Sequence, residues 1–360
     1  MRALPVLEAR RTSMDTCIHC PKLCRGACPV SEATPVESLT PWGKVAIASF
    51  EAHGDVDVDD HSAGTAWACT GCHACRSECK HGNDVAGTLF DVRDAVRRHG
   101  LLPAARATLL DFDAHLGRTA RAAKAFDTGR DPGGTDTALL VGCGYLRMHA
   151  GVARDIVGVA RAYSRSEVDV RPECCGLPLL HAGDAEGFGA HAKSVARSLS
   201  RYRSVLVGDP GCAFALRVLF ANSGATIRGD VELVLERVHR GLERLRMRQT
   251  EAVRWHDPRQ LGRGLGIYDA PREILRRVTG TPPREFRHVR ENGRCSGGGA
   301  MLPATRPATA RKIADARLRE HGERGGGVLV TACASSLKSF GHAEGHPVRD
   351  LHSLVAEALG

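Results

Sequence analysis

Eight of the fourteen cysteines fall into two short runs that could bind metal clusters. The first has the spacing C-x2-C-x3-C-x3-C followed by Pro29, and the second has the spacing C-x2-C-x2-C-x3-C. Short intervals let three successive thiolates bend round one iron–sulfur core, while the fourth cysteine reaches a neighbouring core. The runs therefore predict two [4Fe–4S] clusters with exchanged fourth ligands. We expect Cys17, Cys20, Cys24 and Cys79 on one cluster, and Cys69, Cys72, Cys75 and Cys28 on the other.

Zinc is the alternative metal for these cysteines, because C-x2-C pairs also bind zinc. Zinc pairs are usually separated by a long spacer, whereas here four cysteines fall within about a dozen residues. The pattern therefore favours iron–sulfur clusters. The three-residue gap between Cys20 and Cys24 is longer than usual, and we expect the extra residue to bulge outward. His19, His73 and His81 flank the cysteines, and we expect them to donate hydrogen bonds or to face solvent.

Three further cysteines follow short apolar runs. The runs 137–141, 205–207 and 328–330 lead to Cys143, Cys212 and Cys333. Each run is typical of a buried strand in a parallel sheet, where ligands bind at the carboxyl ends of the strands. Helical patterns at 151–163, 184–202 and 304–321 intervene, which indicates an alternating α/β fold.

The cysteine spacing in this half of the chain repeats. Thirty residues separate Cys143 from Cys174, and thirty-six separate Cys175 from Cys212. In a second copy, thirty-seven residues separate Cys295 from Cys333. We therefore expect two tandem α/β repeats. The N-terminal part should instead be helical, with a helix starting near Trp42, an exposed acidic turn at 55–60 and helices over 87–130.

Composition and charge exclude several classes of protein. The chain is 42% hydrophobic and 25% charged, but only 4% aromatic, and its net charge is +9. No basic stretch alternates with aromatic residues that could stack on bases, so we expect no nucleic-acid partner. The glycine patterns at 142–144 and 262–266 lack the complete dinucleotide fingerprint, so we expect neither NAD nor flavin. Residues 1–16 have no apolar core and no run approaches the ~20 apolar residues of a membrane helix, which favours the cytoplasm.

The order of these motifs resembles a known family. A module for two cubane clusters, followed by two repeats with the pattern C…CCG…C, is similar to the cysteine-rich CCG-domain iron–sulfur proteins. The segments 174–178, 256–258 and 268–272, which read CCGLP, HDP and YDAPR, resemble signatures of that family. The family includes catalytic subunits of heterodisulfide reductases and the iron–sulfur subunits of glycolate oxidase, anaerobic glycerol-3-phosphate dehydrogenase and lactate utilisation.

The resemblance implies a multidomain α+β fold. A helical ferredoxin-type domain with two [4Fe–4S] clusters would occupy residues 1–100, and a helical segment with a linker would occupy 101–136. The first CCG repeat would span 137–250 and a second, degenerate repeat 251–360.

The resemblance also implies a metal centre in the first repeat. Its ligands would be Cys143, Cys174, Cys175 and Cys212, with Asp209 standing where the family has a further cysteine. Asp209 could serve as a harder ligand or simply form a turn after the strand. The second repeat has lost most of its ligands, because Arg259, Arg294 and Ser336 occupy three cysteine positions. Cys295 and Cys333 would then be buried remnants, and the two arginines would bind an anion or pair with carboxylates.

Two redox hypotheses follow. In the first, the chain is an electron-transfer subunit that relays electrons from a partner flavoprotein dehydrogenase, or another redox subunit, to a quinone or other acceptor. The route would run through the two cubanes and a third cluster in the first repeat, and a partner or membrane subunit would hold the chain at the inner face of the membrane. In the second, the first repeat itself reduces a disulfide, as in heterodisulfide reductases. A zinc-stabilised interaction protein is a third, non-redox alternative.

Overall fold

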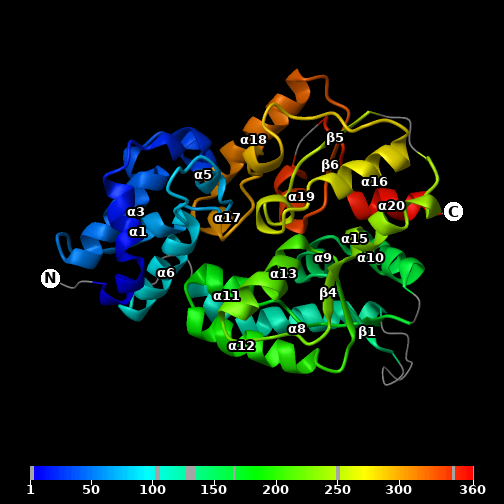
Figure 1. Ribbon diagram of the computed structural model, residues 1–360, viewed down its shortest axis with the longest axis horizontal. Helices are drawn as coiled ribbons and strands as arrows, with labels where there is room; N and C mark the ends of the chain where they lie inside the picture. The colour runs from blue at the N-terminus through cyan, green and yellow to red at the C-terminus, as the bar shows by residue number, and fades with distance from the viewer. Residues whose placement is uncertain are drawn as a thin grey trace. The chain divides into compact units, whose positions relative to one another are not determined.

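The computed structural model describes residues 4–101, 106–126, 135–164, 167–248, 252–342 and 345–359, and Figure 1 follows the elements along the chain. The expected linker 127–134 lies outside the described residues. The chain forms two compact units. Unit one comprises residues 1–111, 178–187 and 288–317, and unit two comprises 112–177, 188–287 and 318–360.

Unit one is helical. Its longer helices are α1 (Arg11–Ile18), α3 (Pro41–His53) and α6 (Val85–Arg98). Its shorter elements are η1 (Pro5–Arg10), η2 (Leu23–Ala27), α2 (Pro29–Ala33), η3 (Glu37–Leu39), α4 (Asp60–Ala63), η4 (Gly64–Trp67), α5 (Ala74–Ser77), α7 (Arg106–Leu110), η10 (Arg290–Asn292) and α17 (Leu302–Thr305). The predicted helix near Trp42 is confirmed as α3, and the predicted helices over 87–130 correspond to α6, α7 and α8 (Phe112–Ala123), the last of which belongs to unit two. The acidic turn at 55–60 is exposed except for the half-buried Val58.

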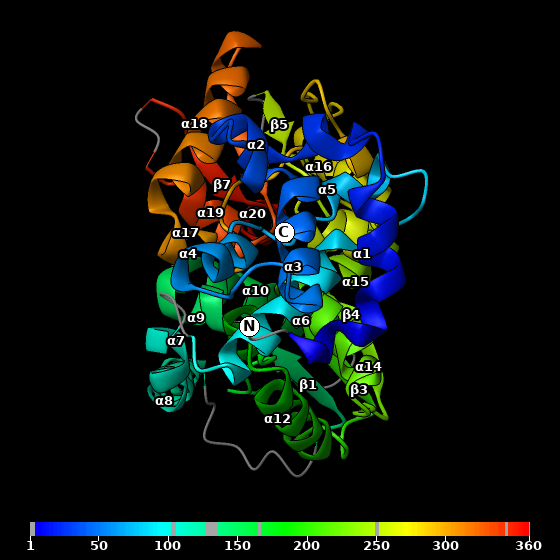
Figure 2. The same cartoon turned by 90° about the vertical axis from the view of Figure 1, so that its left-hand side faces the viewer.

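Helix α3 shows why this stretch becomes a helix. Thr40 caps its start by accepting a hydrogen bond from the Gly43 amide at 2.9 Å, and Pro41 occupies the first turn. Both are favoured at a helix N-terminus. The helix ends at Gly54, whose φ of 76° suits a glycine. α3 packs against both α1 and α6 (Figure 2) around a core that includes Val45, Trp67 and Val92.

Unit two contains two small parallel sheets. The first has the strand order β2-β1-β3-β4, and the second has the order β5-β6-β7. The strands are β1 (Thr137–Leu140), β2 (Asp169–Val170), β3 (Ser204–Val207), β4 (Asp230–Leu233), β5 (Val253–Trp255), β6 (Val328–Thr331) and β7 (Val348–Asp350). The three apolar runs predicted as buried strands are β1, β3 and β6, each central or next to the centre of its sheet.

Helices precede, connect and follow the strands of unit two. They are α8, η5 (Lys124–Phe126), α9 (Cys143–Met148), α10 (Ala150–Tyr163), α12 (Ala185–Ser198), α13 (Pro210–Phe214), η7 (Ala215–Leu219), α14 (Phe220–Asn222), α15 (Val234–Arg240), η8 (Leu242–Arg244), η9 (Gln260–Gly264), α16 (Asp269–Thr279), α19 (Ala334–Phe340) and α20 (Leu351–Ala358). The predicted helices 151–163, 184–202 and 304–321 correspond to α10, α12 and α18 (Pro307–Glu323). The α+β class with helical and parallel-sheet parts is thus confirmed.

Two segments of the repeats belong to unit one rather than to unit two. Residues 178–187, which include most of α11 (Leu177–Ala182), come from the first repeat. Residues 288–317 come from the second repeat and carry Cys295. The expected domain boundaries at 100, 136 and 250 stay a prediction. Across the described ranges of the chain, no helix is long and apolar enough to cross a membrane.

Candidate metal centres

The first cysteine run gathers with Cys79. Cys17 lies at the end of α1 and Cys24 lies in η2. Burial raises the pKa of Cys17 to about 12, with further contributions from Cys24, Cys20 and Cys79. Burial likewise raises the pKa of Cys24 to about 11, and Cys79 is the neighbour that contributes most. Because thiols raise one another's pKa only when they are close, Cys79 lies near the first run, which is compatible with the crossed assignment.

The longer gap in the first run is taken up by one residue. Lys22 has a φ of 66°, in the left-handed region, so the chain reverses between Cys20 and Cys24. Its half-buried side chain pairs with Glu37 at 3.3 Å, and its Nζ lies 3.6 Å from the centre of the Trp42 ring. The next residue, Leu23, is 62% exposed, so the longer gap bulges outward there, as expected.

The second run gathers with Cys28. Burial raises the pKa of Cys75 well above its ordinary value, and the contributing thiols are Cys72, Cys69, Cys28 and Cys24. Gly71 and His73, with φ of 63° and 57°, turn the chain between these cysteines. The Gly71 amide donates a hydrogen bond to the Cys69 Sγ at 3.3 Å. Thiols of the second run thus lie close to thiols of the first run, with Cys28 and Cys24 both near Cys75.

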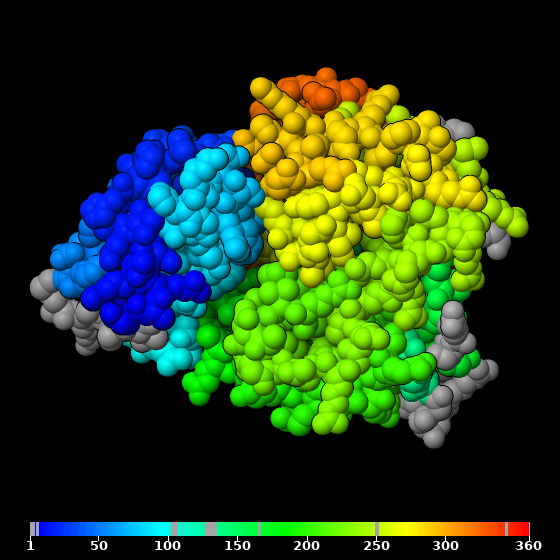
Figure 3. All heavy atoms as spheres, viewed as in Figure 1, coloured from blue at the N-terminus to red at the C-terminus, as the bar shows by residue number. Residues whose placement is uncertain are grey.

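The flanking histidines are not among the converging groups. His19 and His81 are exposed, and His81 belongs to the segment 76–82 at the surface, in the light-blue region of Figure 3. His73 lies 3.3 Å from the Asp84 carboxylate. Burial on its own raises the pKa of Asp84. The hydrogen bond with His73 and its charge outweigh this effect, so the pKa falls to about 2.

Two buried cations lie beside the second set of cysteines, and the sequence analysis did not single them out. Lys44 is 2% exposed, and its Nζ donates to the Ala68 carbonyl at 2.7 Å and to the Cys28 Sγ at 3.8 Å. Arg93 is fully buried and donates to the Cys69 carbonyl at 3.0 Å. Burial raises the pKa of Cys69, whereas the charges of Lys44 and Arg93 lower it.

The four cysteines of the first repeat form a row in unit two. The Cys174 Sγ donates a weak hydrogen bond to the Cys143 Sγ at 3.9 Å. The Cys175 thiol forms hydrogen bonds with both Cys174 and Cys212. The hydrogen bond with Cys175 lowers the pKa of Cys212. Burial, the charge of Asp209 and the other thiols outweigh this effect and raise the pKa to about 12. The structure thus brings together all four residues expected in this repeat.

The ends of the strands position this row. Gly142 follows β1 with a φ of 101°, and a Cβ there would lie 2.8 Å from the Asp209 Cβ and 3.8 Å from the Cys212 Sγ. Only glycine therefore fits where the two loops meet. Cys143 begins α9, and Cys212 lies in α13 directly after β3.

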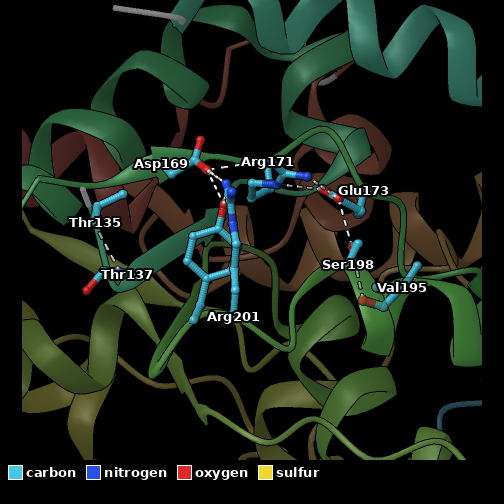
Figure 4. A network of polar contacts seen from close by, with 9 residues as sticks. Thr135, Thr137, Asp169, Arg171, Glu173, Val195, Ser198 and Arg201 are labelled. Carbon is cyan, nitrogen blue, oxygen red and sulfur yellow. Dashed lines mark hydrogen bonds and ion pairs between the residues drawn. The ribbon is translucent and has the colours of Figure 1, made fainter. Parts of the chain in front are cut away.

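A polar network fixes the loop that carries Cys174 and Cys175. Arg171, at the end of β2, pairs with Glu173 at 2.7 Å and with Asp169 at 3.5 Å. Ser198 at the end of α12 donates to Glu173 at 2.9 Å, and Arg201 pairs with Asp169 at 3.1 Å (Figure 4). The approach to the cysteine pair is therefore tied to both β2 and α12.

Asp209 forms the turn that was one of its two expected roles. Its carboxylate accepts hydrogen bonds from the Gly211 amide at 2.8 Å and from the Ala334 amide at 3.2 Å. Burial raises its pKa, and those amides lower it. Both oxygens are thus engaged, although the group remains close enough to Cys143 and Cys212 to raise their pKa values.

His115 of α8 is a residue of this site that sequence reasoning missed. Its ring lies with Cys143 and Cys174 so that their ligand atoms are all within 4.8 Å of one another, and its Nε2 is 3.4 Å from the Cys174 Sγ. Arg147 approaches the Nδ1 at 2.5 Å. Because a guanidinium can only donate, Nδ1 accepts and Nε2 carries the proton. His115 therefore donates a hydrogen bond to Cys174. Nothing in the local sequence marks it, since 59 residues separate the two.

The remnants of the second repeat fall in different units. Cys295 is buried in unit one, where it packs with Cys72 and Ala74. Cys333 is buried at the start of α19 in unit two. Arg294 pairs with the Glu32 carboxylate at 3.0 Å and donates to the Gly26 carbonyl. Of the two expectations for this arginine, pairing with a carboxylate is the one observed.

The remaining signature motifs form a structural clamp. Arg272 of the YDAPR segment pairs with Asp257 of the HDP segment at 2.8 Å and with Glu285 at 2.6 Å. The Trp255 ring nitrogen also donates to Asp257 at 2.8 Å. These residues hold the end of β5 against the start of α16.

Comparison with known families accounts for both sets of sites. Residues 13–83 match the 4Fe-4S dicluster domain, and residues 137–217 and 253–337 each match the cysteine-rich domain. The chain is therefore an iron–sulfur protein. It belongs to the CCG-domain iron–sulfur proteins, with a dicluster domain ahead of two cysteine-rich domains.

Individual relatives are similar over parts of their length. One of the subunits of the dihydromethanophenazine:CoB–CoM heterodisulfide reductase of Methanosarcina barkeri is 28% identical over 212 residues, which cover 52% of this chain and 49% of the relative. One of the subunits of the fumarate reductase (CoM/CoB) of Methanothermobacter marburgensis is 26% identical over 312 residues, covering 82% and 61%. A probable membrane-anchored ferredoxin of Chromohalobacter salexigens is 24% identical over 412 residues, covering 96% and 60%. The chain thus spans about half to three-fifths of the length of these relatives.

The residues present fit iron–sulfur clusters. All eight N-terminal cysteines are free thiols, and thiols of both runs lie close together. Lys44 adds an independent observation, because a buried ammonium beside a cysteine sulfur requires a negative group nearby. A cluster with four thiolate ligands supplies that charge.

Proposed function

We propose that this chain is an electron-transfer subunit of an oxidoreductase complex. Electrons from a partner flavoprotein dehydrogenase would pass through the two [4Fe–4S] clusters and a third centre in the first repeat to a quinone or other acceptor. The observation that carries the proposal is the gathering of thiols from both cysteine runs in unit one. Two clusters in one small unit serve electron relay, because neither needs an open coordination site.

The proposed ligands follow the geometry. Cys17, Cys20, Cys24 and Cys79 would hold one cluster, and Cys28, Cys69, Cys72 and Cys75 the other. Cys143, Cys174, Cys175 and Cys212 would hold the third centre, with His115 donating a hydrogen bond to Cys174. In the cytoplasm these thiols would stay reduced, and a partner subunit would hold the chain at the inner face of the membrane. The relative named as a membrane-anchored ferredoxin supports that placement.

A second candidate is disulfide reduction at the first repeat. Similarity to the heterodisulfide reductase of Methanosarcina barkeri favours it, as does the row of four thiols in unit two. The loss of cysteines at 259, 294 and 336 counts against a version that needs a cluster in both repeats.

Anaerobic purification with iron, sulfide and zinc analysis tests the proposal. Two cubanes predict about eight irons per chain, and a third centre raises this number. EPR of the reduced protein should show two interacting cubane signals. A colourless protein that contains zinc and no iron would refute the proposal. Co-purification of a flavoprotein supports electron relay, whereas turnover of a disulfide by the isolated chain supports the second candidate.

A further inference from the structure

Lys44 is a buried cation that the proposed ligand assignment does not use. Its side chain is 2% exposed, and its Nζ donates to the Ala68 carbonyl at 2.7 Å and to the Cys28 Sγ at 3.8 Å. In the described part of the chain no carboxylate forms an ion pair with it. An ammonium removed from water in this way costs several kcal/mol unless a negative group compensates. The charge is therefore placed to interact with whatever Cys28 binds.

Arg93 adds a second positive charge on the same side. It is fully buried, and its guanidinium donates to the carbonyls of Ala66, Cys69, His181 and Ala300 at 2.8–3.1 Å. These four bonds fix the charge at the backbone of Cys69.

The cations near the first set of cysteines are different. Lys22 and Arg25 are accessible to solvent, and both pair with Glu37, at 3.3 and 3.1 Å. Solvent and carboxylates screen these charges, so they have little effect on a buried group. The two sets of cysteines thus differ in the charge that faces them.

We infer that Lys44, assisted by Arg93, makes the cluster held by Cys28, Cys69, Cys72 and Cys75 the higher-potential cluster of the pair. The inference rests on the proposed function, because it requires both clusters. Reduction adds one electron and one negative charge, and a nearby buried cation stabilises the reduced state. When one electron leaves the first cluster, which is thereby oxidised, it reduces the second, and no proton is needed. The electron therefore comes to rest beside Lys44.

Redox titration followed by EPR tests this inference. Lys44→Met removes the charge and the donors, Lys44→Gln removes only the charge, and Lys44→Arg keeps both. Lys312→Met is the matched control, because Lys312 is an exposed lysine of α18 in the same unit. Cys75→Ser and Cys24→Ser identify which EPR signal belongs to which cluster.

We expect Lys44→Met and Lys44→Gln to weaken reduction of the Cys75 cluster at least tenfold, about 59 mV for one electron. The Cys24 cluster should not change, and Lys44→Arg and Lys312→Met should titrate like the parent protein. Unchanged potentials in fully loaded Lys44→Met protein would overturn the inference. So would a shift no larger than that of Lys312→Met.

A measurement without any lysine variant keeps the test decisive if the neutral variants fail to load iron. In the parent protein, the signal assigned through Cys75→Ser must titrate at the higher potential. The reverse order overturns the inference. Protein with about eight irons and the reverse order still supports the proposed function, whereas protein without iron refutes both.

Discussion

At the scale of single residues, the crossing of the fourth ligands is the feature most open to direct test. Cys79 contributes to the raised pKa of Cys17 and Cys24, and Cys28 contributes to that of Cys75 and, as the smallest of its causes, to that of Cys24. We therefore predict that Cys79→Ser alters the same EPR signal as Cys24→Ser. Cys28→Ser should alter the signal that Cys75→Ser alters. If Cys79→Ser and Cys75→Ser changed one common signal, each run would hold its own cluster.

The thiols of the first repeat predict how the metal-free protein responds to alkaline pH. The folded-state pKa of Cys212 is about 12, above the value near 8.5 of an unfolded thiol. Its protonated form therefore stabilises the fold below about pH 8.5, and this contribution is lost as the pH rises toward 12. Urea unfolding at pH 8 and pH 10 should show a loss of stability for the metal-free protein.

Cys212→Ser is the control for this pH effect, since serine does not ionise in that range. The variant should lose less stability between pH 8 and pH 10 than the parent protein. Equal losses would show that the Cys212 thiol is not responsible.

At the scale of elements, Gly43 in α3 is the position where helix propensity and packing conflict. Replacing glycine by alanine inside a helix usually stabilises it by about 1 kcal/mol. A Cβ on Gly43, however, would lie 2.1 Å from the Glu37 carbonyl oxygen and 2.9 Å from the Ser38 Cα. We predict that Gly43→Ala destabilises unit one by about 1–3 kcal/mol, as overpacking does.

Gly64→Ala is the matched control, because nothing lies within 4 Å of a Cβ at Gly64 and its φ is −60°. Denaturant unfolding of the two variants should move in opposite directions, or Gly64→Ala should be neutral. Gly43→Ala protein as stable as the parent would show that η3 and α3 can separate at no cost.

The elements also show what sequence patterns can predict. β1, β3 and β6 are continuous apolar runs, so their burial and pairing were predictable. β2 has only two residues, and β4 and β7 contain charged residues, so no periodic pattern marks them. The cysteine sets were predictable because ligand spacing is local. Lys44 and His115 were not, because their sulfur partners lie 16 and 59 residues away in sequence.

At the scale of the whole molecule, residues 288–317 of the second repeat are a structural part of unit one, although the repeat has lost most of its cysteines. Leu302, Ala310 and Ile313 are buried with Cys28 and Ala68 in one apolar cluster. Burying each large aliphatic side chain contributes about 1.5–3 kcal/mol. That is a large share of the 5–15 kcal/mol typical of folded proteins.

We therefore predict that a truncated protein ending at Arg248 fails to hold its N-terminal clusters, even though all eight of their ligands are present. Iron analysis and circular dichroism of the truncated and full chains would check this. A truncated protein with about eight irons per chain would show that unit one is complete without residues 288–317.

Unit one is assembled from distant segments of the chain, and this affects the order of events during biosynthesis. The last cluster ligand, Cys79, is translated early, but the segment 288–317 that completes the core around Cys28 follows roughly 200 residues later. At ~5–20 residues per second, the ribosome needs ~10–40 s for that interval. Throughout it the nascent chain carries eight reduced thiols in an unfinished core. We therefore expect stable cluster insertion only after the C-terminal third of the chain has been made.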